Sequence, residues 1–144
     1  MILNPRPEDF GWMVQARCYS DLRDVGLRIL TRAGPPVTMV CGPITTGGLG
    51  YWKANMERFA RCIRTVSGNG FWVFNQLVFE DTLWRIRKYN GKSDDTLLQE
   101  FYLPLFQSGI MKSLHFISGW PTSYGTRWEH KQALKLGLEI KYLA

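Results

Sequence analysis

The chain has 144 residues, 45% of which are hydrophobic, so we expect one domain that buries a substantial core. Eighteen Lys and Arg outnumber twelve Asp and Glu, and the formal net charge at pH 7 is +6. Because the basic residues are scattered rather than clustered, we expect this charge to be a solvated surface with at most a small anion site, and no nucleic-acid polymer is expected as the partner.

The N-terminal segment, residues 1–36, is predicted to be a partly helical appendage. It ends at a clear break in the sequence, RAGPP, which spans Arg32–Pro36. Before that break, Phe10–Leu30 carries apolar residues at mixed spacing with intervening glycines, which favours a helix over part of its length. The main domain is therefore expected to comprise residues 37–144.

From Val37 onward the sequence predicts alternating strands and helices. Short apolar or aromatic runs predict strands buried in a sheet, and apolar residues at helical spacing predict amphipathic helices. The segment Gln76–Asp95 mixes apolar and charged residues and is expected to form a short helix with mobile connections, a natural place for a lid. The predicted strands are Val37–Cys41, Phe71–Asn75, Ser113–Ser118 and Leu138–Leu143, and the predicted helices are Trp52–Val66, Thr96–Phe106 and Glu129–Leu136.

This alternation predicts an α/β fold, with a single parallel sheet of the flavodoxin or Rossmann type and helices on both faces. In such sheets ligands bind beyond the carboxyl ends of the strands. Two loops are therefore candidate binding segments. They are GPITTGGLG, Gly42–Gly50, after the first predicted strand, and GWPTSYGT, Gly119–Thr126, after the third.

The three cysteines and two histidines show none of the spacings of a disulfide framework or a zinc site. We therefore expect no metal, and a reducing, cytoplasmic environment. No run approaches the roughly 20 apolar residues of a membrane span, so no membrane association is expected.

The glycine-rich loop Gly42–Gly50 has two interpretations. It is predicted to lie between a strand and a helix, where free N–H groups and the helix dipole can hold an anion. However, it lacks both the G-K-[ST] of a P-loop and the dinucleotide pattern G-x-G-x-x-G. A plain connection explains its four glycines equally well.

Glu129 also has two interpretations. The sequence TRWE, Thr126–Glu129, matches a capping box. In this arrangement the Thr126 side chain would cap the helix, and the Glu129 side chain would accept a hydrogen bond from the backbone N–H of Thr126. The same position near a helix start favours an ionised carboxylate, which is the form that a nucleophile requires. The sequence leaves the choice between cap and catalytic carboxylate open.

The order of the segments CGPI, GFWVFN and GWPTSYGTRWEHKQALKLGLEIKYL resembles the nucleoside 2-deoxyribosyltransferase-like superfamily, which includes nucleoside deoxyribosyltransferases and nucleoside 5'-monophosphate N-glycosidases. The resemblance covers about Val37–Ala144. Its most specific part is S-x-G-x-x-x-E with an alanine four residues further on, which here is Ser123, Gly125, Glu129 and Ala133.

This resemblance implies a parallel sheet, with Glu129 as the nucleophile that attacks the anomeric carbon of a ribosyl or deoxyribosyl group. It also implies that Ser123 and the Gly125 backbone hold the 5' end of the sugar or its phosphate. The first-strand loop would line the base side, through Gly42, Pro43, Ile44, Thr45 and Thr46.

The chain departs from the superfamily pattern at one acidic position. Members carry an aspartate near the helix that leads into the strand before the motif, and it assists protonation of the leaving group or orients the site. Here no Asp or Glu lies between Glu100 and Glu129. The acidic residues that could take its place are Glu80, Asp81, Asp94 and Asp95.

We therefore expect cleavage or transfer at the N-glycosidic bond of a nucleoside or nucleotide, through a glutamate nucleophile and without a cofactor. The partner would be a small molecule, and the protein is expected to be a homo-oligomer. One alternative is a non-catalytic nucleotide or sugar-phosphate binding protein on the same fold. Another is an interaction protein whose residues 1–36 form a dimer or partner surface.

Overall fold

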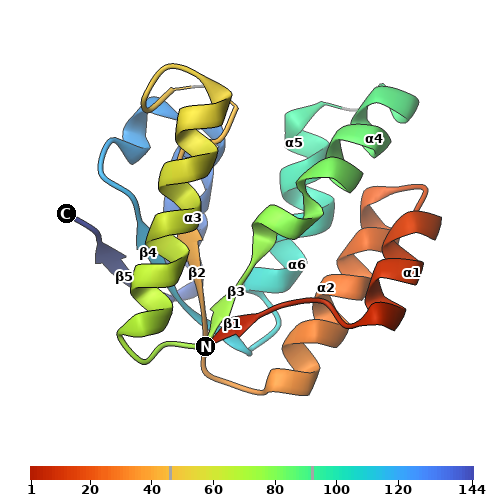
Figure 1. Ribbon diagram of the computed structural model, residues 1–144, viewed down its shortest axis with the longest axis horizontal. Coiled ribbons are helices and arrows are strands. Elements are labelled where there is room, and N and C mark those ends of the chain that lie inside the picture. Colours follow the sequence, from red (N-terminus) through yellow and green to blue (C-terminus); the bar gives the residue numbers. More distant parts are fainter. Residues whose placement is uncertain (46, 92) are drawn as a thin grey trace.

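The computed structural model describes residues 1–45, 47–91 and 93–144 (Figure 1). Its strands are β1 (Ile2–Leu3), β2 (Val37–Cys41), β3 (Val73–Phe74), β4 (Met111–Phe116) and β5 (Glu139–Tyr142). They form one sheet in the order β1-β3-β2-β4-β5, and every pairing is parallel. The predicted α/β class with a parallel sheet is confirmed, and all four predicted strands are present.

Helices connect successive strands and cover the sheet. The helix predicted between the first two strands is confirmed as α3 (Trp52–Gly68). The one predicted before β4 is assembled from α5 (Asp94–Leu97), a π turn (Leu98–Tyr102) and α6 (Leu103–Phe106). The α-helices are α1 (Pro7–Gln15), α2 (Tyr19–Ala33), α3 (Trp52–Gly68), α4 (Glu80–Asn90), α5 (Asp94–Leu97), α6 (Leu103–Phe106) and α7 (Tyr124–Leu136). Shorter turns occupy Gln76–Phe79 (3-10), Leu98–Tyr102 (π) and Trp120–Thr122 (3-10).

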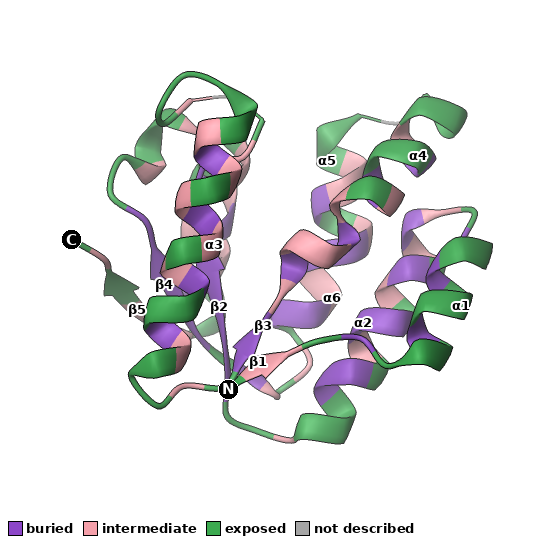
Figure 2. Ribbon diagram, viewed as in Figure 1, coloured by how far each residue is buried: buried purple, intermediate pink, exposed green. Residues whose placement is uncertain are grey.

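The sheet has a hydrophobic core on each face, because alternate strand residues point to opposite sides. On one face Met39, Phe74 and Leu114 belong to the larger core, which also contains side chains of α2, α4, α6 and α7. On the other face Val40 and Val73 pack with residues of α3. Figure 1 shows α3 on one side of the sheet and α2, α4 and α6 on the other. Every residue of β2 is buried, which explains its continuous apolar run (Figure 2).

Residues 1–36 pack into the same body as the rest of the described chain. Ile2 and Leu3 form an edge strand whose partner in the sheet is β3, about 70 residues away in sequence. The apolar face of α2 is buried in the larger core. Gly26 lets α2 approach α6, since a Cβ there would lie 3.0 Å from a Leu105 methyl carbon. The sequence did not indicate this packing.

A partly buried ion pair joins α1 to α2. The carboxylate of Asp9 is fully buried and accepts hydrogen bonds from the Arg32 guanidinium and, at 2.8 Å, from the Arg6 backbone N–H. The hydrogen bond from Arg32 is the main cause that holds the pKa of Asp9 below its usual value.

We expect Asp9→Ala to lower the free energy of unfolding by about 2 kcal/mol at pH 7, because it removes both a partly buried pair and a helix-start bond. Asp9 has a depressed pKa, so its contribution is present above the unfolded pKa of about 3.9 and is lost as the pH falls below it. The difference between variant and wild type should therefore shrink in acid. Urea denaturation at several pH values measures it. The exposed pair Arg23–Asp24 provides the control, since Asp24→Ala should change stability by less than about 0.5 kcal/mol. Equal effects of the two substitutions would contradict the assignment.

Candidate functional site

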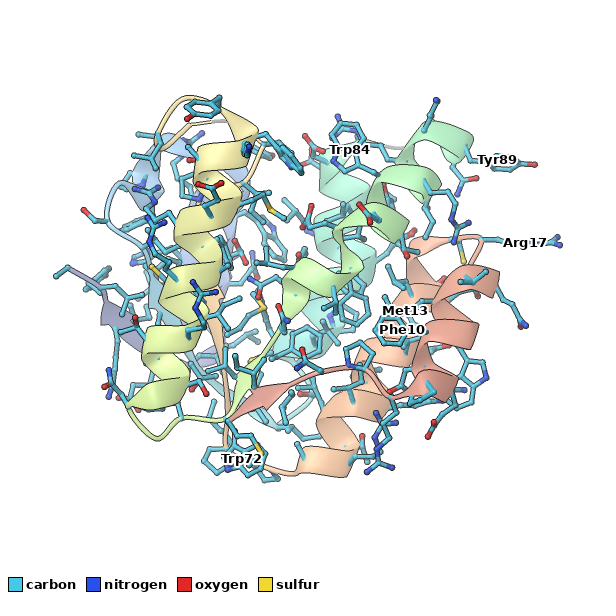
Figure 3. The ribbon with its side chains drawn as sticks, in the orientation of Figure 1. Phe10, Met13, Arg17, Trp72, Trp84 and Tyr89 are labelled. Atoms are coloured by element: carbon cyan, nitrogen blue, oxygen red, sulfur yellow. The ribbon has the colours of Figure 1, made fainter. Side chains whose placement is uncertain are left out.

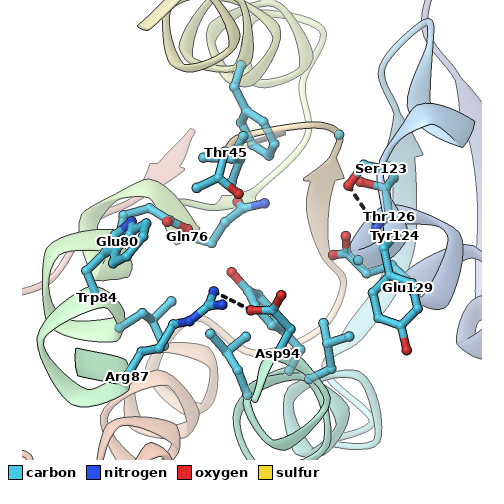
Figure 4. A pocket seen from close by; sticks show the side chains of 18 residues that line it. Thr45, Gln76, Glu80, Trp84, Arg87, Asp94, Ser123, Tyr124, Thr126 and Glu129 are labelled. Atoms are coloured by element: carbon cyan, nitrogen blue, oxygen red, sulfur yellow. Dashed lines mark hydrogen bonds and ion pairs between the residues drawn. The ribbon is translucent and has the colours of Figure 1, made fainter. Parts of the chain in front are cut away.

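A cavity of about 170 Å³ lies at the carboxyl ends of β2 and β4 (Figure 4). One wall comes from the loop after β2, a second from the Gln76–Phe79 turn and α4, and a third from the first turns of α7. The π turn Leu98–Tyr102 adds Leu98 and Tyr102. This is the edge of the sheet where the parallel topology predicts ligand binding.

Most of the site residues predicted from the sequence meet in this cavity. Its lining includes Glu129, Ser123 and Gly125 from α7 and its N-cap, and Gly42, Ile44 and Thr45 from the loop after β2. Pro43 is buried within that loop, where its Cβ lies 2.9 Å from the place a Cβ on Gly48 would take. Thr46 lies outside the described residues.

The loop after β2 is held in shape by Asn55, a fully buried residue of α3. Its Oδ1 accepts a bond from the Leu49 N–H at 2.9 Å, and its Nδ2 donates to the Ile44 and Gly47 carbonyls. The Gly48 N–H donates to the Thr122 hydroxyl at 2.7 Å, which ties this loop to the segment before α7. Gly47 and Gly48 have positive φ, and a Cβ on either would clash with these neighbours. Gly47 therefore serves the close contact between the two candidate loops, and Gly48 the close contact of its loop with Asn55.

Ser123 is the N-cap of α7. It has an extended backbone, and its Oγ accepts a hydrogen bond from the Thr126 N–H at 3.3 Å. The predicted capping box on Thr126 is wrong, because α7 begins at Tyr124 and Thr126 is buried in its first turn. Gly125, a poor helix former, obscured the earlier start. Glu129 is thus free of a capping role and lines the cavity.

Ser123→Ala should lower the free energy of unfolding by about 1 kcal/mol, because it removes the cap of α7. Ser123→Gly should cost only a few tenths of a kcal/mol, since glycine also suits an N-cap position. Chemical denaturation of the two variants measures the difference. Equal stability of the alanine variant and the wild type would show that the hydroxyl does not cap this helix.

Glu129 has an unusual environment for a carboxyl group. It is 7% exposed, and burial, assisted by the charge of Glu80, raises its pKa to about 8, although a hydrogen bond with the Cys41 thiol acts in the opposite direction. The proton on Glu129 is therefore sensitive to pH near neutrality. Burial also raises the pKa of Cys41 and of Tyr102 well above their usual values, so both stay protonated there.

Glu80 is the second carboxyl group of the cavity. It is the first residue of α4 and lies on the wall opposite Glu129 (Figure 4). Burial, with a smaller contribution from the charge of Asp81, raises its pKa to about 7. Of the other acidic residues considered from the sequence, Asp94 lines the cavity but pairs with Arg87 at 2.5 Å. Asp95 accepts a bond from the Tyr124 hydroxyl.

Sequence reasoning missed Gln76 and Tyr102, which line the cavity together with Trp84, an aromatic residue that could stack on a base. Gln76 is 2% exposed, and its Nε2 donates to the carbonyl of Val40 at 2.5 Å. The available signal was a spacing of four residues between Gln76, Glu80 and Trp84, which puts them on one helical face. Mixed charges in this segment hid that periodicity.

Neither a metal site nor a membrane-spanning helix is found in the described chain. No group of three or more His, Cys, Asp and Glu side chains there is placed to hold a metal ion. Among the described helices, none combines the length and the apolar character needed to span a bilayer.

The fold and the cavity define an α/β protein with a parallel sheet and two carboxyl groups at its carboxyl edge, of which Glu129 is buried and Glu80 is half-buried. Comparisons with protein-family models, curated proteins and solved structures found no match. The function is therefore inferred from the chemistry of the cavity.

Proposed function

We propose that the protein cleaves or transfers the N-glycosidic bond of a nucleoside or nucleotide, as a relative of the nucleoside 2-deoxyribosyltransferase-like superfamily. The observation that carries this proposal is the placement of Glu80 and Glu129 on opposite walls of one cavity. The sequence motif Ser123, Gly125, Glu129 and Ala133 supports it, since it lies at the carboxyl edge of a parallel sheet.

Two carboxyl groups in different protonation states suit this reaction. In the first step the Glu129 carboxylate attacks the anomeric carbon, and the bond to the base nitrogen breaks. The bonding electrons pass to the base while Glu80 gives it a proton, so a neutral base leaves. In the second step Glu80 takes a proton from water or from an acceptor base, which attacks the same carbon and releases Glu129 as a carboxylate.

The reaction requires that one of the two carboxyl groups, Glu80 and Glu129, is protonated while the other is ionised. Two ionised carboxylates in one buried site repel each other, so ionisation of one raises the pKa of the other. A substrate that develops positive charge at its anomeric carbon, beside Glu129, favours the arrangement in which Glu129 is ionised and Glu80 carries the proton.

The start of α7 would hold the 5' end of the sugar. Ser123 and Gly125 line the cavity there, and the first backbone N–H groups of a helix lack intrahelical acceptors. The Ser123 hydroxyl accepts the Thr126 N–H, so it would offer its own proton to the ligand. Arg127 donates to the Pro121 carbonyl at 2.6 Å and does not line the cavity.

A non-catalytic nucleotide or sugar-phosphate binding protein is the second candidate. It is favoured by the raised pKa of Glu129, because a carboxyl group that is neutral below about pH 8 is not a nucleophile. Binding without turnover at every pH would select it.

The test is incubation of the protein with a panel of nucleosides and their 5'-monophosphates, followed by chromatography of the released bases. Acid quenching and mass spectrometry should also detect a glycosyl adduct on Glu129. Absence of base release over pH 5 to 9 would reject the catalytic proposal. A homo-oligomer remains expected, and light scattering from the purified protein measures it.

A further inference from the structure

The wall of the cavity opposite Glu129 presents three side chains in a row. Gln76, Glu80 and Trp84 are spaced by four residues along the Gln76–Phe79 turn and α4, and all three line the cavity. Figure 4 shows Gln76 and Glu80 together on the side away from Ser123 and Glu129. We call these three residues the α4 wall.

Gln76 has a fixed orientation and an unused acceptor. Its Nε2 donates to the Val40 carbonyl, so the amide nitrogen cannot exchange places with the oxygen without losing that bond. Its Oε1 has no hydrogen-bond partner among the described residues, although it is buried. A buried acceptor left unpaired is costly. A ligand beside Gln76 that offers an N–H or O–H donor would remove that cost.

Glu80 and Trp84 supply the neighbouring features. In the reactive state of the proposed function Glu80 carries a proton, so it presents an O–H donor next to the Gln76 acceptor. Trp84 lines the cavity while 50% exposed, so its ring has surface left for a flat ligand to stack on. Tyr89, further along α4, is 87% exposed and points outward instead (Figure 3).

An acceptor beside a donor distinguishes the nucleobases. Adenine offers an amino N–H donor at N6 next to the acceptor N7, and cytosine offers a donor at N4 next to the acceptor N3. Hypoxanthine and uracil carry a carbonyl oxygen in place of that amino group. That carbonyl oxygen of the base would face the Gln76 Oε1, so two hydrogen-bond acceptors would be opposed with no donor between them.

We propose that the α4 wall recognises a base with an exocyclic amino group beside a ring nitrogen acceptor, as in adenine or cytosine. Gln76 accepts from the amino group, Glu80 donates to the ring nitrogen, and Trp84 stacks on the ring. This assignment rests on the proposed function, because it takes the α4 wall as the base side of the cavity. It also gives Glu80 direct access to a nitrogen that must be protonated for the base to leave.

Calorimetric binding of free bases at a pH below about 7, the value to which the pKa of Glu80 is raised, tests this recognition without turnover and with Glu80 protonated. We expect adenine to bind about 10-fold more tightly than hypoxanthine, or cytosine about 10-fold more tightly than uracil, as a bidentate contact confers. The pair that shows the preference identifies the purine or the pyrimidine as the ligand. Equal affinity within both pairs, or no binding of any of the four bases, overturns the proposal.

Two variants locate the contact. Gln76→Met keeps the length of the side chain but removes the acceptor, and it should bring the affinity ratio within the preferred pair close to one. Trp84→Ala changes a half-exposed residue, and it should weaken both members of the pair while leaving their ratio unchanged. A ratio that survives in a folded Gln76→Met protein overturns the assignment, as does a ratio abolished by Trp84→Ala. If the protein prefers one base in binding but releases no base from any nucleoside, the catalytic function is rejected and the role of the α4 wall stands. If it releases bases but shows no binding preference, the role of the α4 wall is rejected and the catalytic function stands.

Discussion

Glu129→Gln is expected to lower kcat for base release by roughly 10³-fold or more, because an amide cannot attack the anomeric carbon. The glycosyl adduct should disappear as well. Substrate binding should persist, since glutamine fills the same volume and the other walls of the cavity are unchanged. Steady-state kinetics, mass spectrometry of the quenched enzyme and calorimetry measure these three properties.

The stability of the same variant separates a catalytic role from a structural one. The folded pKa of Glu129 lies above its unfolded value of about 4.3, so the folded state binds the extra proton between these values. Stability of the wild type should therefore fall as the pH rises from about 4 to about 8. Glu129→Gln removes the Glu129 part of this dependence, leaving the smaller part due to Glu80, and should be at least as stable as the wild type at pH 8. Glu139→Gln, on the exposed strand β5, is the matched control and should keep full activity. Full activity in Glu129→Gln would reject the nucleophile.

The pH profile of the wild type should be bell-shaped, with its maximum between about 7 and about 8, the values to which the pKa of Glu80 and Glu129 are raised. Below this window both groups are protonated and no nucleophile exists. Above it both are ionised and no acid remains. Cys41 and Tyr102 do not titrate here, because burial holds the pKa of each well above its usual value.

Glu80→Gln should lower kcat/KM by about 10²- to 10⁴-fold, the usual contribution of a general acid. The alkaline limb of the profile should vanish. The acid limb should then report Glu129 alone and lie between about 7 and about 8, because burial, the main cause of the raised pKa of Glu129, is unchanged and only the smaller contribution of the Glu80 charge is lost.

A nucleoside whose base already carries a positive charge through ring methylation tests the acid role directly. That base leaves without protonation, so Glu80→Gln should lose far less activity on it than on an ordinary nucleoside. Asp81→Asn, on the same turn but outside the cavity lining, should retain both limbs of the profile. An equal loss on both kinds of substrate would assign Glu80 a positioning role instead.

Local sequence patterns were enough to predict the sheet. Val37–Cys41 is apolar at nearly every position because the strand is buried on both faces. Burial on both faces is typical of parallel sheets, so the amino-acid composition of this short segment is enough to indicate the strand. Phe59, Ile63 and Val66 recur at helical spacing because α3 packs one side on that sheet. Glu129, Ser123 and Gly125 were found because they lie within one short motif that faces the cavity.

Segments that depend on distant partners could not be predicted in the same way. Ile2 and Leu3 are too short a run to signal a strand, and only pairing with β3 makes them one. The cap of α7 was misplaced by three residues because Ser123 and Thr126 are both suitable caps, and packing of Thr126 in the interior decides between them.

Taken alone, the sequence determined the parallel α/β architecture and the position of Glu129 at the carboxyl edge, because both follow from periodicities and motifs within a few residues of one another. Only the tertiary structure placed two of the four acidic candidates, Glu80 and Asp94, in the cavity lining and left the Gln76 carbonyl oxygen without a partner among the described residues. Those properties arise from burial and from contacts between segments about 35 to 50 residues apart. Desolvation and hydrogen-bond satisfaction depend on the whole fold, so no local pattern encodes them.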